Sequence, residues 1–185
     1  MEEARLEDGG SGLAPTTEGW FVVNVRDAMW LTSEGGDKRT SGSETTFEGR
    51  VEFADFAVRI HVLEPGEPNG LYHAESAQEG FLVLAGECRL IVEGEERILR
   101  PWDFFHSPAG TEHIFVGAGD GPCAVLMGGA HPPDWSVRYA VSKLAARYGA
   151  SVAEETTRPT GVYEGWEPSR RARPSYWDRL PWADS

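Results

Sequence analysis

The sequence predicts an all-β domain, a sandwich or barrel of short strands followed by one C-terminal helix and an extended C-terminal tail. Apolar and β-branched segments recur through the middle of the chain. Glycine and proline turns separate them at intervals of roughly 8–12 residues, a spacing typical of such folds. The 185 residues include 22 glycines and 12 prolines, which suits many turns and short strands. A chain of this length holds about one domain.

The N-terminal part of the chain is expected to be a tail that leads into the barrel. Residues 1–18 contain five acidic side chains and one arginine, with little apolar content, which is typical of a mobile or loosely docked segment. Residues 20–31 are apolar with partial alternation, which predicts a strand. The polar composition of residues 32–46 predicts a loop.

The predicted barrel spans residues 19–130, and most of its strands lie after residue 50. Residues 51–63 are apolar and β-branched apart from Arg59 and His61. The Glu93-Gly94 pair lies between two apolar runs, which indicates a hairpin. The other predicted strands are short apolar runs at 81–85, 88–92, 97–99, 104–105, 114–116 and 124–127.

A helix is predicted within residues 131–150, packed on the outside of the barrel. Asp134 is a candidate N-cap, and Gly149 is a plausible C-terminal stop. Between them, four apolar residues share one helical face at i, i+4, i+7 and i+11, namely Val137, Val141, Leu144 and Tyr148. Residues 151–185 form the extended tail, which is polar and proline-rich until large aromatic residues return at 176–182.

The charge and the cysteine count exclude several classes of protein. Thirty acidic and 17 basic residues give a formal net charge of −13, which repels phosphate backbones and anionic lipid. We therefore expect neither a nucleic-acid nor a membrane partner. The N-terminus lacks the features of a secretory signal, and no apolar run approaches the ~18 residues of a membrane helix. Cys88 and Cys123 cannot form a disulfide framework. A cytoplasmic location is the expectation.

Histidines and glutamates in two separate segments have the residue types of a metal site. His73 and Glu75 are two residues apart, hence on one face of an extended segment, and Glu79 follows. His113 lies three residues after the turn glycine Gly110. Two imidazoles and one carboxylate match the set of three ligands that binds non-haem Fe(II) and leaves positions open for substrate or oxygen.

These residues resemble the two cupin motifs. The segment His73-x-Glu75-x3-Glu79-x6-Gly86 is similar to the first motif, and Pro108-x-Gly110-x2-His113 is similar to the second. The resemblance covers roughly residues 50–130. It implies a small jelly-roll β-barrel, often dimeric, with one divalent metal ion such as Fe, Mn, Zn or Ni in the barrel mouth. Position by position, His73, Glu79 and His113 match the family's ligands.

The sequence departs from the family pattern at the second histidine of the first motif, where Glu75 stands. Either Glu75 is a fourth ligand, adding negative charge to the site, or it points away and leaves three ligands. Gln78 offers a further carbonyl oxygen beside Glu79.

Four other polar residues are weaker candidates. Arg59 and His61 share one face of a predicted strand whose other face is apolar. Either they line a substrate cavity, with Arg59 pairing an anion and His61 acting as acid or base, or this face is the wet outside of the sheet, which is the preferred interpretation. His106 is expected to serve strand packing, and His131 to lie in a surface loop.

The sequence supports more than one function for such a site. The first hypothesis is a metal-dependent enzyme acting on a small polar molecule, with dioxygenase-like chemistry ahead of isomerase, epimerase or decarboxylase chemistry. This order is an analogy with the family. The alternative is a cupin that binds a small molecule without turnover. A homodimer is expected, with residues 20–25 and the aromatic tail at the interface.

Overall fold

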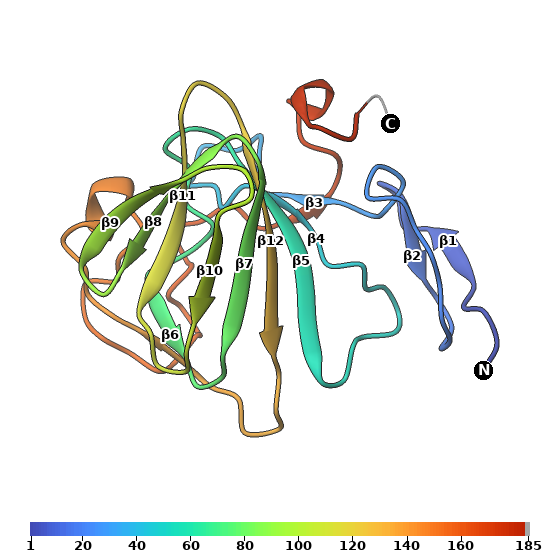
Figure 1. Cartoon of the computed structure of the whole chain (residues 1–185), viewed down its shortest axis with the longest axis horizontal. Helices are drawn as coiled ribbons and strands as arrows, with labels where there is room; N and C mark the ends of the chain where they lie inside the picture. The colour runs from blue at the N-terminus through green and yellow to red at the C-terminus, as the bar shows by residue number, and fades with distance from the viewer. Residues whose placement is uncertain (184–185) are drawn as a thin grey trace.

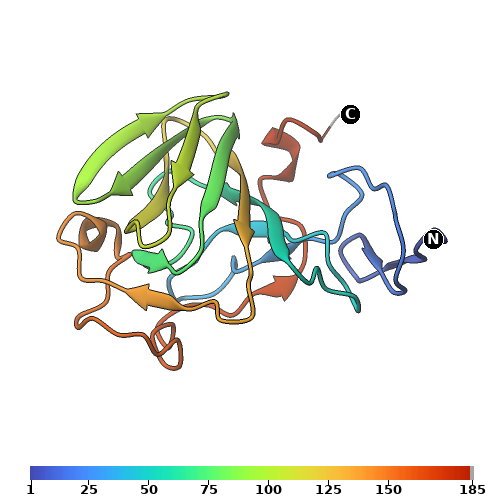
Figure 2. The ribbon, with the colours of Figure 1, turned by 60° about the horizontal axis from the view of Figure 1, so that its bottom comes forward.

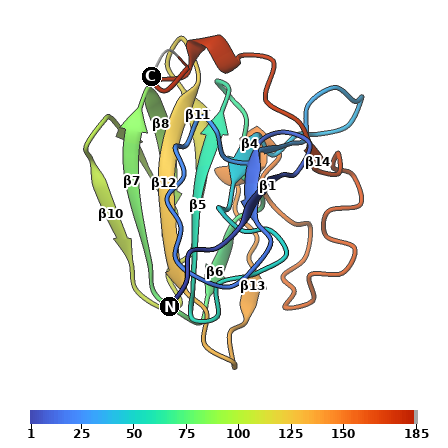
Figure 3. The ribbon, with the colours of Figure 1, turned by 90° about the vertical axis from the view of Figure 1, so that its right-hand side faces the viewer.

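The computed structural model describes residues 1–183 and confirms the all-β prediction. The strands form two antiparallel sheets of seven and five strands and a separate two-stranded hairpin. Figure 1 shows the larger sheet across the middle of the molecule with the smaller sheet beside it, and Figure 3 gives the side view.

The larger sheet contains the longest strands of the barrel. Strand β12 (Cys123–Ala130) pairs with a long strand on each side over most of its length, and two short strands, β10 (Phe104–Ser107) and β14 (Arg170–Arg171), lie at the edges. In spatial order the seven strands are β10 (Phe104–Ser107), β7 (Glu79–Ala85), β12 (Cys123–Ala130), β5 (Phe56–Leu63), β4 (Ser43–Thr45), β3 (Leu31–Thr32) and β14 (Arg170–Arg171).

The smaller sheet closes the other side of the barrel. In spatial order its strands are β13 (Val137–Tyr139), β6 (His73–Glu75), β11 (His113–Ala118), β8 (Glu87–Val92) and β9 (Glu95–Leu99). The turn between β8 and β9 is the predicted Glu93-Gly94 hairpin. Both turn residues have positive φ, 48° and 77°, as a two-residue turn needs to match the twist of its strands.

Apolar residues fill the barrel and also cover its outside. The interior core includes Phe81, Val83, Phe115 and Val125, all at most 3% exposed. A second cluster lies on the outer face of β5, where Ile60 and Val62 pack with residues from distant parts of the chain, namely Trp30, Tyr176, Leu180 and Trp182. The C-terminal segment, which includes a short 3-10 helix at Trp177–Arg179, therefore covers the face of β5 that points away from the barrel interior.

The predicted helix within residues 131–150 is wrong. Val137–Tyr139 is a strand that pairs with β6, and its residues alternate between buried and half-buried. Only a 3-10 turn follows, at Ala145–Tyr148, and residues 1–183 contain no α-helix. Pairing with an open sheet edge outweighed the helical spacing, and two β-branched or aromatic residues in three favour a strand. Gly149 does terminate the 3-10 turn, in the left-handed conformation with φ 69°.

The N-terminal part also differs from expectation. Residues 20–31 do not form a continuous strand, because Asn24 closes a turn by accepting the backbone N–H of Arg26 on its side chain and those of Asp27 and Ala28 on its carbonyl. Within residues 1–18, the strands β1 (Leu6–Asp8) and β2 (Leu13–Pro15) pair as a hairpin. Figure 2 shows this hairpin outside the two sheets.

Candidate metal centre

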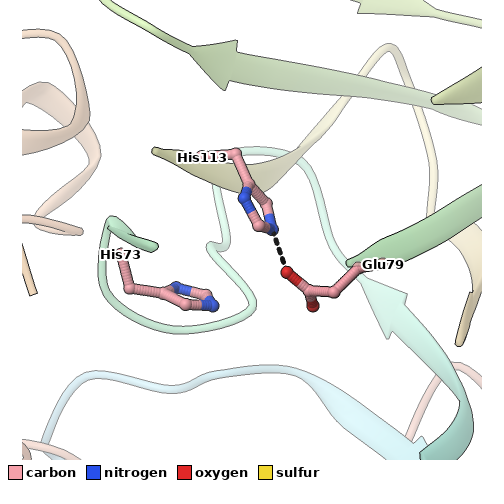
Figure 4. A group of neighbouring side chains, drawn as sticks. All are labelled: His73, Glu79 and His113. Atoms are coloured by element: carbon pink, nitrogen blue, oxygen red, sulfur yellow. Dashed lines mark ion pairs between the residues drawn. The ribbon is translucent and has the colours of Figure 1, made fainter. Parts of the chain in front are cut away.

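Three predicted ligands come together at one end of the barrel. His73 and His113 are opposite each other in the register of β6 and β11, and their ring centroids are 5.0 Å apart. Glu79 begins β7 in the other sheet. One donor atom from each residue lies within 4.8 Å of the other two. Figure 4 shows both imidazoles and the carboxylate around one space.

Backbone hydrogen bonds orient both imidazoles. Nδ1 of His73 lies 2.6 Å from the carbonyl oxygen of Leu71, and Nδ1 of His113 lies 3.1 Å from that of Thr111. A carbonyl oxygen can only accept, so Nδ1 carries the hydrogen in each ring. The Nε2 atoms are then left with lone pairs, which is the arrangement that metal-bound histidines adopt when the second nitrogen donates to the protein.

The carboxylate of Glu79 completes the donor set of the two imidazoles. Its Oε2 atom is buried and has no hydrogen-bond partner among residues 1–183. Nε2 of His113 lies 3.5 Å from this oxygen and faces it with a lone pair. Two electron-rich atoms at this distance repel unless a proton or a cation lies between them. The residues therefore fit a divalent ion held by two nitrogens and a carboxylate oxygen.

Burial sets the protonation states of the three residues. It raises the pKa of Glu79 to about 8, with help from the negative charge of Glu75. It lowers the pKa of His113 to about 4, with help from the neighbouring His73, and it lowers the pKa of His73 as well. The imidazoles are thus neutral near pH 7, as metal ligation requires. A divalent ion would offset the cost of ionising Glu79 in this buried place.

The cluster opens into a cavity of about 330 Å³, within the range of small-molecule sites. Its walls also carry Arg59 and His61, and His61 is only 6% exposed. The preferred interpretation of this strand face as the wet outside of the sheet is therefore wrong, because the face points into the barrel. The opposite, apolar face of β5 packs under the C-terminal segment.

The carboxylate of Glu44 on β4 contacts both Arg59 and His61 on the neighbouring strand β5. Its Oε2 lies 2.7 Å from Nε2 of His61 and 3.2 Å from the guanidinium of Arg59. Burial alone would raise the pKa of Glu44, but the charges and hydrogen bonds of His61 and Arg59 outweigh burial and lower this pKa to about 2.

The low pKa of Glu44 predicts a specific loss of stability in acid. The unfolded chain takes up a proton near the ordinary value of 4.5, and the folded protein only near 2. The stability from this group is complete above about pH 4.5 and is lost as the pH falls toward 2, a change of about 2–3 kcal/mol. Urea denaturation gives the free energy of unfolding of wild type and of Glu44→Gln. The difference between the two should shrink by this amount as the pH falls from 4.5 toward 2. Glu95→Gln, which changes an exposed carboxylate on β9, is the control. A difference independent of pH contradicts the prediction.

The two other predicted oxygen ligands lie beside the cluster. Glu75 lines the cavity, with Oε1 3.9 Å from Nε2 of His73, while its Oε2 accepts a hydrogen bond of 2.7 Å from the indole N–H of Trp135. Its ligation stays a prediction. Gln78 is exposed, and its Oε1 is 3.4 Å from Nε2 of His106, outside the cavity that holds the three donors.

Sequence reasoning missed several residues of the cavity wall. Glu44 lay in a segment predicted as a loop, and Tyr139 lay in the predicted helix. His131, expected in a surface loop, lines the cavity with its ring 4.8 Å from that of Trp135. Tyr163 comes from the tail, and its hydroxyl accepts the backbone N–H of Leu71. Only tertiary contacts place these residues, so no local pattern could have found them.

One family model and several solved structures are similar to part of this chain. Residues 59–129 match the family model described as "Cupin domain". A sugar phosphate isomerase from a cupin superfamily of Silicibacter pomeroyi aligns at 28% identity and a TM-score of 0.49, over 53% of this chain and 64% of that one. A putative sugar phosphate isomerase from Acidithiobacillus ferrooxidans aligns at 21% identity and a TM-score of 0.47, over 52% and 65%. The chain thus covers slightly less than two thirds of either protein.

A comparison with curated proteins found no match. In residues 1–183, no helix has the length and apolar character needed to cross a membrane.

Proposed function

We propose that this chain, which carries a cupin domain over residues 59–129, is a metal-dependent enzyme that acts on a small polar molecule in the barrel cavity. The observation that carries the proposal is that donor atoms of His73, Glu79 and His113 lie within 4.8 Å of one another, while Oε2 of Glu79 is buried without a hydrogen-bond partner among residues 1–183. His73, Glu79 and His113 would hold one divalent ion, with Fe, Mn, Zn and Ni as the candidates.

The roles of the residues around the site follow from their contacts. A divalent ion held by the three ligands would supply Lewis-acid polarisation of a ligand oxygen and, if redox-active, would take part in oxygen chemistry. The carbonyls of Leu71 and Thr111 keep the two imidazoles in the ligating tautomer. Apolar and aromatic side chains at the inner end, such as Phe81 and Met127, exclude water behind the site.

Two reaction classes remain candidates, each with its own support. Three protein ligands leave open positions, which favours oxygen-dependent chemistry of the dioxygenase type. The buried His61 beside Glu44 favours proton transfer, as in isomerases and epimerases. Oxygen-uptake measurements on iron-loaded protein with small acids, thiols and catechols separate the two. A module that binds without turnover would show only ligand-dependent stabilisation.

A matched pair of carboxylate variants tests the metal site and the role of Glu75. Glu79→Gln is expected to weaken zinc binding by about 100-fold or more, because it removes a charged donor. Glu75→Gln is expected to weaken it by less than about tenfold, because the amide oxygen still accepts from Trp135. Isothermal titration of metal-free protein measures both. Equal losses of zinc affinity in the two variants would indicate that Glu75 is also a ligand. An unchanged zinc affinity in Glu79→Gln would contradict the proposed metal centre.

A further inference from the structure

A second buried polar pair lies in the wall of the same cavity and is not part of the donor cluster. Glu44 on β4 and His61 on β5 are cross-strand partners in the register, so their side chains lie on one face of the sheet. Nε2 of His61 is 2.7 Å from Oε2 of Glu44. Both residues line the cavity together with His73, Glu79 and His113.

This contact fixes which nitrogen of His61 is the base. The carboxylate of Glu44 can only accept a hydrogen bond, so Nε2 of His61 carries a hydrogen in either protonation state, and in the neutral form the lone pair is on Nδ1. Nδ1 is buried and has no hydrogen-bond partner among residues 1–183. A buried polar atom without a partner costs about 1–3 kcal/mol, which a purely structural residue at this position would have no reason to carry.

We propose that His61 is a proton-transfer residue of this cavity and that Glu44 is its positioning residue. The inference deepens the proposed function and rests on it, since it assumes that a small molecule binds between the metal ligands and His61. The pair is arranged like a catalytic dyad, in which a carboxylate fixes the tautomer of an imidazole and stabilises the imidazolium cation.

The proposed step is a reversible proton transfer. The proton of a ligand O–H or C–H bond passes to Nδ1 of His61, and the electron pair of that bond stays on the ligand. The imidazole becomes an imidazolium, and its new charge is balanced by Glu44 at Nε2. The imidazolium later returns a proton to the ligand, at the same or a neighbouring atom. No oxidant or reductant is consumed.

The tautomer of His61 is the first test, and it needs no metal. Long-range ¹H–¹⁵N spectra of metal-free protein labelled at histidine nitrogens should show that the neutral form of His61 has Nε2 protonated and Nδ1 free. In Glu44→Gln the amide also offers a donor to Nε2, so a mixture of tautomers is expected, and Glu44→Asp should restore the single form. A protonated Nδ1 in neutral His61 of the wild type would overturn the proposal.

The second test measures proton transfer directly. Zinc-loaded protein is incubated in D₂O with dihydroxyacetone or pyruvate, both with C–H bonds next to a carbonyl group, and loss of the C–H signal is followed by ¹H NMR. His61→Ala and His61→Gln are expected to lower the exchange rate by about 100-fold or more, the usual contribution of a general base. Glu44→Gln should lower it less. His106→Ala, at an exposed histidine on β10, should leave it unchanged.

Zinc content and circular dichroism separate the possible failures. His61→Ala should keep one zinc per chain and the wild-type spectrum. If His61→Ala catalyses proton exchange as fast as the wild type, the proposed role of His61 is wrong while the metal centre stands. The same holds if zinc-loaded wild-type protein exchanges protons of neither dihydroxyacetone nor pyruvate. If wild-type protein binds no zinc, the proposed function itself fails.

Discussion

Alanine in place of His113 is expected to abolish stoichiometric metal binding. His113 is 2% exposed, and its Nε2 is one of only two nitrogen donors in the cluster. Without it, His73 and Glu79 would have to hold the ion from opposite sheets with two donors. We expect the affinity for zinc to fall by about 100-fold or more, beyond the 10–100-fold typical of residues that only orient a ligand.

The measurement is the metal content of purified protein by mass spectrometry, followed by titration of metal-free protein with Zn, Mn, Fe and Ni. His106→Ala is the matched control, because it removes an exposed imidazole outside the cavity and should leave one ion per chain. Retention of one tightly bound ion by His113→Ala would show that the cation is held elsewhere. A lower thermal stability of the variant does not affect this readout, provided that its circular dichroism shows a folded barrel.

The three donors could be predicted because the residue types and spacings of two separate segments, residues 73–86 and 108–113, resemble the two cupin motifs. His73 and Glu79 are six residues apart at the starts of consecutive strands, and His113 follows a turn at Gly110. Alternation along each strand then decides which side chains share a face. The strands β5 and β7 to β12 were likewise predicted, because they contain short apolar runs between turn signals, whereas β6, β13 and β14 were not predicted as strands.

The second half of the cavity could not be predicted, because alternation does not say which face is inside. In β5 the apolar face, with Ile60 and Val62, appeared to be the core face, and the face with His61 appeared to be wet. The structure shows the reverse assignment. Residues of the C-terminal segment, more than 110 positions later in the chain, cover the apolar face of β5 from outside the barrel. Tyr176 takes part in this cover, and its hydroxyl donates to the carbonyl of Val62.

The helix within residues 131–150 failed for a related reason. Val137 fits a helical stripe only together with Val141, Leu144 and Tyr148, whereas Val137 and Tyr139 by themselves fit a strand. What decided between the two was the free edge of β6, a partner that lies more than 60 residues earlier in the chain. Non-local pairing of this kind overrides local propensity wherever a sheet edge would otherwise remain open.

If the C-terminal segment decides which face of β5 is inside, then removing the residue on which that segment packs should destabilise the whole barrel. Trp30 is fully buried, its indole N–H donates to the carbonyl of Val25 at 3.0 Å, and its ring contacts Trp177 and Trp182 at centroid distances of 5.4 and 5.5 Å. Trp30→Ala is expected to lower the free energy of unfolding by about 3–5 kcal/mol, as for other buried tryptophans.

Urea denaturation measures this loss, and Trp102→Ala provides the control, since that indole is 75% exposed and its removal should cost less than about 1 kcal/mol. Zinc affinity of the folded Trp30→Ala protein should stay at the wild-type value, because Trp30 belongs to the cluster outside the barrel and the donors lie inside it. A loss below about 1 kcal/mol would mean that the aromatic cover is dispensable, and that the polar lining of the cavity is enforced by the two sheets alone.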